Sequence, residues 1–223
     1  MTTEIRDITL SGRVQGVGFR PFVYRLAHQH GIQGWVRNAI GRVEIHAEGS
    51  HEELERFRHD LLTQAPPLSS PQIEYDEPGE AEHAQGFYIV RSDQTGEADI
   101  HIAPDQYLCP QCEAELLQQD NRRYHYPFIN CTQCGPRYTI IRAMPYDRAN
   151  TSMEAFTLCE LCHEEYQSTE SRRFHAEPNA CGECGPHLSY YDPDNRIELD
   201  SDSALAAAVD ALRRGRILAV KGI

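Results

Sequence analysis

All eight cysteines of this chain lie between positions 109 and 184, arranged as four Cys-x-x-Cys pairs. The pairs are Cys109/Cys112, Cys131/Cys134, Cys159/Cys162 and Cys181/Cys184. Eighteen residues separate the first pair from the second, and the same gap separates the third from the fourth, so each cysteine of the first set recurs fifty positions later. This repeat indicates two copies of one structural unit, each with four thiols of its own.

The Cys-x2-Cys-x18-Cys-x2-Cys spacing is typical of four-thiolate zinc sites. We therefore predict two zinc ions, each held within one repeat. Because four thiolates leave no open coordination position, both ions should be structural. The ligands of the first ion are Cys109, Cys112, Cys131 and Cys134, and those of the second are Cys159, Cys162, Cys181 and Cys184.

An even number of cysteines also permits a disulfide framework. The amino terminus shows no apolar segment typical of a secretory signal, which favours a reducing, cytoplasmic location and disfavours disulfides. His125 and His175 each precede the third cysteine of their repeat by six residues and are alternative ligands, disfavoured because four thiols are already present.

The repeat extends to residues other than cysteine. Arg122-Arg123-Tyr124-His125 corresponds to Arg172-Arg173-Phe174-His175. The two arginine pairs could bind an anion, but ion pairs with nearby glutamates are the favoured interpretation. The aromatic residues near the cysteines should form small apolar caps over the metal sites.

The chain carries 34 acidic and 21 basic residues, a formal net charge of −13. Metal-bound thiolates would make the charge more negative, so binding of nucleic acid through its phosphates is disfavoured. No stretch approaches the roughly 20 consecutive apolar residues that span a bilayer. Neither nucleic acid nor a membrane is an expected partner.

Residues 1–91 show a β-α-β-β-α-β pattern. Strands are predicted at 8–14, 35–38 and 43–47, with two closing strands at 73–75 and 87–90. Helices are predicted at 21–30 and between Ser50 and Pro66-Pro67. Gly31 ends the first helix, and Ser50 with Glu53 forms a capping box for the second. The order predicts an α+β fold of the ferredoxin-like type, with two helices on one face of an antiparallel sheet.

A glycine-rich loop joins the first strand to the first helix. Gly16 and Gly18 allow the backbone to turn its N–H groups inward, which creates an anion site at a helix amino terminus. Arg20 adds a planar fork that matches phosphate oxygens. Without further support, such a loop is more often a plain turn, and Asn38 a plain turn former.

Two segments of the chain resemble the signature motifs of the acylphosphatase family. They are Leu10-Ser-Gly-Arg-Val-Gln-Gly-Val-Gly-Phe-Arg20 and Gly34-Trp-Val-Arg-Asn38, although the turn from Asn38 to Gly41 is one residue shorter than usual. The resemblance implies that Arg20 neutralises a bound phosphoryl group and that Asn38 positions the attacking water. It also implies a phosphate cradle formed by Gln15, Gly16, Val17, Gly18, Phe19 and Arg20.

The order of these motifs resembles the carbamoyltransferases that mature nickel–iron hydrogenase. The resemblance rests on Phe19-Arg-Pro-Phe22, Asn130-Cys-Thr-Gln-Cys-Gly-Pro-Arg-Tyr138 and Arg173-Phe-His175. It implies hydrolysis of carbamoyl phosphate, use of ATP by later domains, and transfer of the carbamoyl group to the carboxy-terminal cysteine of a partner protein. The domains expected are an acylphosphatase-like domain at 1–91, a linker at 92–107 and tandem zinc fingers at 108–190.

Residues 191–223 are interpreted as the truncated start of an ATP-binding, carbamate-adenylating α/β domain. Leu205, Ala208, Val209 and Leu212 form one apolar stripe of a helix, and residues 217–220 read as a buried strand. By the resemblance, Lys221 would begin a nucleotide site.

Three other functions remain open. The first is a zinc-dependent protein-interaction module whose acylphosphatase-like domain is inactive. The second is a zinc protein that binds nucleic acid, which the acidic charge disfavours. The third is a self-sufficient acylphosphatase for which the region after residue 91 is dispensable.

Overall fold

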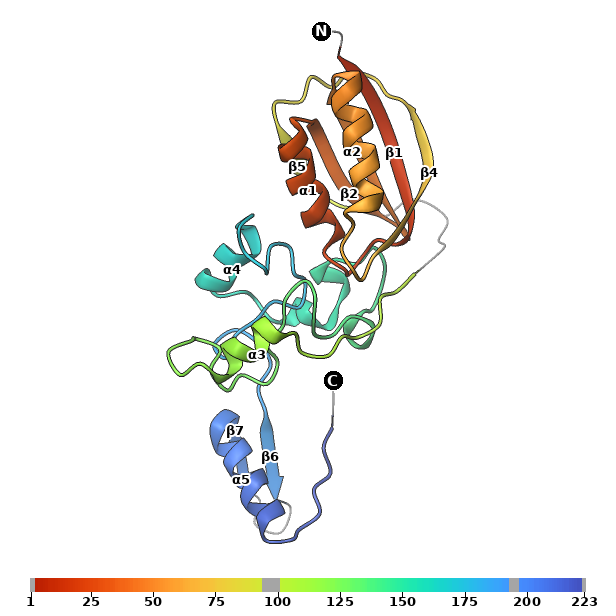
Figure 1. The fold of residues 1–223 in the computed structure, drawn as a ribbon. Helices are drawn as coiled ribbons and strands as arrows, with labels where there is room; N and C mark the ends of the chain where they lie inside the picture. The colour runs from red at the N-terminus through yellow and green to blue at the C-terminus, as the bar shows by residue number, and fades with distance from the viewer. Residues whose placement is uncertain (1–2, 94–100, 193–196, 222–223) are drawn as a thin grey trace.

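A computed structural model describes residues 3–93, 101–192 and 197–221. The chain forms three parts in sequence order (Figure 1). An amino-terminal domain of a sheet and two helices precedes a central region, residues 101–188, of short helices and loops. A small carboxy-terminal unit, residues 189–192 and 197–221, lies on the far side of the central region.

The amino-terminal domain has the predicted element order. Its strands are β1 (Glu4–Arg13), β2 (Gln33–Ala39), β3 (Arg42–Gly49), β4 (Ser70–Pro78) and β5 (Phe87–Ile89), and its helices are α1 (Phe19–His30) and α2 (His51–Thr63). The strand order is β4-β1-β3-β2-β5. The expectation of a fully antiparallel sheet is wrong for β5, which pairs parallel to β2. After β4 the chain reverses and crosses to the opposite edge, so β5 runs in the direction of β2.

The two helices cover one face of the sheet (Figure 1). The apolar stripes that predict these helices are Phe19, Phe22, Val23, Leu26 and Ala27 on α1, and Leu54, Phe57 and Leu61 on α2. All are buried except Phe22, which is half-buried. The capping box is confirmed, because Ser50 N donates to Glu53 Oε2 at 2.8 Å and Glu53 N donates to Ser50 Oγ. This packing fixes the start of α1, and with it the glycine-rich loop, against the ends of β1 and β2.

A charge network centred on the buried His46 of β3 includes Glu48 of β3 and the partly exposed Asp7 of β1. The His46 ring is 2% exposed, contacts Asp7 Oδ1 at 2.7 Å and Glu48 Oε1 at 3.2 Å, and stacks on Trp35. Burial lowers the pKa of His46, but the hydrogen bonds to Asp7 and Glu48 outweigh this and raise it above its usual value. The imidazolium form is therefore favoured by folding.

This network predicts a pH-dependent stability. The contribution of His46 should be fully present below its unfolded-state pKa of about 6.5 and disappear as pH rises through the higher folded-state pKa. We expect the urea midpoint of the amino-terminal domain to fall as pH rises from about 6.5 through the raised folded-state pKa of His46. Fluorescence of Trp35, the single tryptophan, reports this transition directly. His46→Gln should flatten the dependence and the exposed control His59→Gln should retain it; equal pH profiles for the two variants would contradict the assignment.

The central region contains helices α3 (Pro110–Leu117) and α4 (Glu160–Gln167), at corresponding places in the two repeats. Three 3-10 helices lie between them: η1 (Tyr138–Ile140), η2 (Arg148–Asn150) and η3 (Ser152–Ala155). Its small apolar core includes Tyr126, Ile129, Ile140 and Met153 beside three cysteines of the first repeat.

The two repeats hold each other reciprocally. Arg123 of the first repeat donates to Ala180 O at 2.8 Å and forms an ion pair with Glu165 of the second. Arg173 of the second repeat donates to Asn130 O at 2.9 Å and forms an ion pair with Glu115 of the first. The expected ion pairs are thus present, and each joins one repeat to the other.

The carboxy-terminal unit consists of a hairpin of β6 (Ser189–Asp192) and β7 (Ile197–Asp200), followed by α5 (Ser201–Arg213). The hairpin was not predicted, and the buried strand expected at 217–220 is wrong. Ile217 is 98% exposed and Val220 88% exposed, because no described strand offers its backbone a partner there. Lys221 is exposed, and Gly222 lies outside the described residues. No described helix has the length and apolar character needed to cross a membrane.

Candidate active site and metal centres

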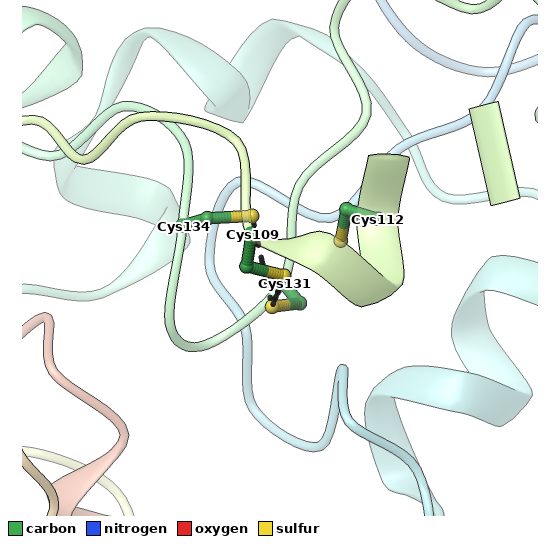
Figure 2. A group of neighbouring side chains, drawn as sticks. All are labelled: Cys109, Cys112, Cys131 and Cys134. Carbon is green, nitrogen blue, oxygen red and sulfur yellow. Dashed lines mark hydrogen bonds between the residues drawn. The ribbon is translucent and has the colours of Figure 1, made fainter. Parts of the chain in front are cut away.

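The eight cysteines form the two predicted groups of four. Within each group all four Sγ atoms lie within 4.8 Å of one another. Figure 2 shows the first group, in which Cys112 projects from α3 toward Cys109 and the loop that carries Cys131 and Cys134. The pairs Cys109–Cys131 and Cys131–Cys134 are separated by 3.8 Å between sulfurs, as are Cys159–Cys181 and Cys181–Cys184.

This sulfur spacing fits a tetrahedral metal ion. A zinc–sulfur distance of about 2.3 Å places two ligands of a tetrahedron about 3.8 Å apart. A disulfide requires about 2.05 Å, and all eight cysteines are free thiols. No described histidine belongs to either group, so His125 and His175 are not ligands.

Arginines of the opposite repeat approach the thiol groups. Arg122 Nη2 lies 3.2 Å from Cys162 Sγ, and Arg172 Nη1 lies 3.6 Å from Cys112 Sγ. Four thiolates around a divalent cation would leave two net negative charges, which these guanidinium groups would balance. The ion pairs and the metal centres therefore form one electrostatic unit across both repeats.

The glycine-rich loop has the geometry of an anion cradle. Gly16 and Gly18 have φ values of 70° and 73°, in the left-handed region where a side chain is disfavoured. Gly18 is the N-cap of α1, and no side chain caps that helix. Among the described residues, no acceptor contacts the backbone N–H groups from Gln15 to Arg20. The cradle can therefore accept an anion without breaking an existing bond.

Arg20 and Asn38 lie together at this loop, although they belong to α1 and β2. Arg20 Nη2 and Asn38 Nδ2 donate to the same oxygen, the carbonyl of Tyr146, at 3.2 and 3.1 Å. Both side chains are buried, at 8% and 1% exposure. Asn38 Oδ1 is also buried and has no hydrogen-bond partner among the described residues.

The central region completes this site with residues that the sequence analysis missed. Arg20 forms ion pairs with Asp147 through Nη1 and with Glu177 through Nη2, each at 2.8 Å. Gln15 Oε1 accepts from Tyr146 N at 2.9 Å, and Arg137 donates to the Gly16 carbonyl. The sequence held one indication of Glu177, which is that it departs from the fifty-residue repeat. The corresponding position in the first repeat is a proline, Pro127.

Charged side chains of both signs line the cradle. Arg20 and Arg137 are the two arginines that line the cavity, and Glu177 is its lining carboxylate. Burial lowers the pKa of the Arg20 guanidinium, but Glu177 and Asp147 outweigh this effect and raise it. Arg20 therefore stays charged.

His175 also lines the cavity. Burial and the nearby positive charge of Arg20 lower the pKa of His175 to about 4. At neutral pH this ring is therefore uncharged and leaves the charge balance around the cradle unchanged.

The cavity between the loop and the central region is small, about 20 Å³. Its lining comes from both parts of the chain: Gln15, Gly16, Gly18, Arg20 and Asn38 on one side, and Thr132, Arg137, Tyr146, His175 and Glu177 on the other. An anion bound in the cradle would be enclosed by groups from both.

Family models match two parts of the chain. The acylphosphatase model matches residues 6–89, and the HypF finger model matches residues 108–141 and 158–196. Carbamoyltransferase HypF2 of Cupriavidus necator is 52% identical over all of this chain, which spans 28% of that protein. The acylphosphatase of Bacillus licheniformis is 42% identical over 83 residues and 92% of its own length.

Solved structures show the same arrangement. A crystal structure of full-length HypF in its phosphate- and nucleotide-bound form is 38% identical and superposes with a TM-score of 0.87. It is matched over all of this chain and 29% of its own length.

Proposed function

Because this chain belongs to the HypF carbamoyltransferase family, of which it covers the acylphosphatase domain and the finger region, we propose that it hydrolyses acyl phosphates. The proposed substrate is carbamoyl phosphate, and Arg20 and Asn38 are the proposed catalytic residues. The observation that carries this proposal is the shared contact of both side chains with one oxygen beside the cradle of free N–H groups.

In the proposed mechanism, the N–H groups from Gln15 to Arg20 hold the phosphoryl oxygens, and Arg20 neutralises their charge. Hydrolysis of a phosphoryl group depends mainly on positioning and on fixed electrostatic donors, because its transition state is loose. The loop supplies such donors without rearrangement, since none of them is otherwise bonded within the described residues. Arg137 fixes the loop itself through the Gly16 carbonyl.

Asn38 has one anchored end and one free end. Its Nδ2 donates to the Tyr146 carbonyl, which leaves the unpaired Oδ1 to accept a hydrogen bond from a water molecule. That water attacks phosphorus as the bond from phosphorus to the carbamoyl oxygen breaks. Carbamate leaves with that bridging oxygen, and inorganic phosphate keeps the oxygen of water.

The rest of the pathway is proposed from the family. Carbamate would pass to an ATP-dependent adenylation step in later domains, and the carbamoyl group would then reach the carboxy-terminal cysteine of a hydrogenase-maturation partner. In this scheme residues 191–223 begin the adenylating domain, and Lys221 lies near the start of its nucleotide site.

Two structural zinc ions are the proposed cofactors of the central region. Its thiol groups have the donor type and spacing for this ion and leave no position for a substrate. When bound, each zinc ion would cross-link the two Cys-x-x-Cys pairs of its own repeat. The Tyr146 carbonyl and the carboxylates that contact Arg20 and Asn38 come from this same region, so the fold around the ions supports the site.

Release of phosphate from carbamoyl phosphate tests the proposal. We expect the unmodified chain to turn over and Asn38→Ala to lose roughly 10²–10³ in kcat, the typical effect of removing one fixed polar group from such a site. The Trp35 fluorescence spectrum checks that the variant domain is folded. Turnover of the unmodified chain at the background rate would support the alternative, an interaction module with an inactive acylphosphatase-like domain.

A further inference from the structure

We propose that Glu177, assisted by Asp147, is a positioning residue that orients the Arg20 guanidinium toward a phosphoryl group in the loop of residues 15–20. This inference rests on the proposed function and adds to it. The acyl phosphate site would then be shared between the amino-terminal domain and the second cysteine repeat.

The contacts of Arg20 leave part of its guanidinium free. A guanidinium carries five N–H groups. Asp147, Glu177 and the Tyr146 carbonyl engage three of them, all on Nη1 and Nη2. The other two N–H groups, one on Nε and one on Nη1, have no acceptor in the described part of the chain and can bind phosphoryl oxygens.

Glu177 is itself firmly held. It is 2% exposed, and its second oxygen, Oε2, accepts from Tyr166 Oη and from Arg148 N, each at 2.9 Å. Tyr166 lies on α4, the helix that begins between two cysteines of the second group. A continuous set of hydrogen bonds therefore runs from the second repeat through Glu177 to Arg20. A flexible arginine side chain needs such support to keep one orientation.

The same carboxylates could instead act as a plug that competes with substrate. Two observations favour positioning. The loop N–H groups have no acceptor among the described residues, so the carboxylates do not fill the cradle. A second guanidinium, that of Arg137, also lines the cavity beside Arg20, so an anion in the cradle would meet two cations.

Comparison of the two repeats supports a specific role. The hydrogen-bonded pair Tyr166 and Glu177 corresponds, fifty residues earlier, to Leu116 and Pro127. The first repeat has neither polar group, and neither of its two residues lines the cavity at Arg20. The metal-binding framework alone therefore does not require this pair, which is present only in the repeat that contacts Arg20.

The test compares Glu177→Gln with Glu164→Gln, a matched change at an exposed site on α4. Two quantities are measured on the whole chain: kcat/KM for carbamoyl phosphate, and the Kd of inorganic phosphate by titration calorimetry. We expect Glu177→Gln to lower kcat/KM by about tenfold to a hundredfold, as misplacement of a catalytic group does, and to weaken phosphate binding. Glu164→Gln should change neither.

A double-mutant cycle separates positioning from a merely structural role. In the Arg20→Ala background, Glu177→Gln should leave the Kd of phosphate unchanged, because the guanidinium that Glu177 orients is no longer present. An equal loss in that background, an unchanged Glu177→Gln variant or a more active one would overturn the proposal. If Glu177→Gln does not fold, Tyr166→Phe removes one donor to Glu177 and should weaken phosphate binding in the same Arg20-dependent way.

The binding measurement also separates this proposal from the proposed function. If the unmodified chain binds phosphate but does not hydrolyse carbamoyl phosphate, the proposed hydrolase function is wrong. The positioning role would then stand or fall on the Kd values alone. An unmodified chain that does not bind phosphate would overturn both.

Discussion

Replacement of Cys162 by serine should release both zinc ions and unfold the whole central region. A structural zinc site contributes roughly 10–16 kcal/mol to folding, and this region has little apolar core with which to compensate. The loss should spread to the first repeat, because Arg122 and Arg123 of that repeat contact the Cys162 sulfur. Metal analysis should fall from two zinc ions per chain to fewer than one.

The amino-terminal domain serves as an internal control in this experiment. Its core contains none of the cysteines, so the Trp35 fluorescence spectrum should remain that of a folded domain. His163→Ser, an exposed change on the same helix, should keep both ions. Retention of one full zinc ion by the Cys162→Ser chain would show that the repeats fold independently, against the reciprocal arrangement described above.

Replacement of Arg20 by alanine should lower kcat/KM for carbamoyl phosphate by roughly 10³ or more, the range known for arginines that stabilise a transferring phosphoryl group. The change removes a guanidinium that contacts the Tyr146 carbonyl and the carboxylates of Asp147 and Glu177. Phosphate release measures the effect. Arg56→Ala, an exposed change on α2, is the matched control and should retain full activity.

Arg20→Ala should also destabilise the contact between the amino-terminal domain and the central region. It leaves Glu177 buried without its cation, and breaking a buried pair in this way costs about 3–5 kcal/mol. The double variant Arg20→Ala with Glu177→Gln should therefore melt at a higher temperature than Arg20→Ala alone, while both remain inactive. Equal melting temperatures would show that the Glu177 carboxylate does not destabilise the protein when Arg20 is absent.

Several elements followed from the sequence because their determinants are local. The Cys-x-x-Cys pairs place two sulfurs on one short turn, and the fifty-residue repeat assigns each pair to its group. The apolar stripe from Phe19 to Ala27 predicts α1, and the capping box at Ser50 predicts the start of α2. Each of these signals lies within or next to the helix that it predicts. The loop around Gly16 and Gly18 is likewise set by backbone freedom at two positions.

Other predictions failed where a residue depends on a neighbour distant in sequence. The parallel pairing of β5 with β2 follows from the path that the chain takes across the sheet. The apolar residues at 87–90 predict a strand but do not indicate which strand it pairs with or in which direction. The apolar run at 217–220 has strand character, but a strand requires a hydrogen-bonding partner, and no described segment supplies one. Local pattern alone could not decide either case.

The sequence by itself determined the two four-thiol groups, the ferredoxin-like element order and the loop that carries Arg20. Each of these depends on spacing or periodicity over a few residues, or on an exact repeat. Only the tertiary structure decided what surrounds Arg20, because Asp147 and Glu177 lie 127 and 157 residues further along the chain. Folding brings those carboxylates to the cradle through the packing of the central region on the amino-terminal domain, an arrangement that no local pattern encodes.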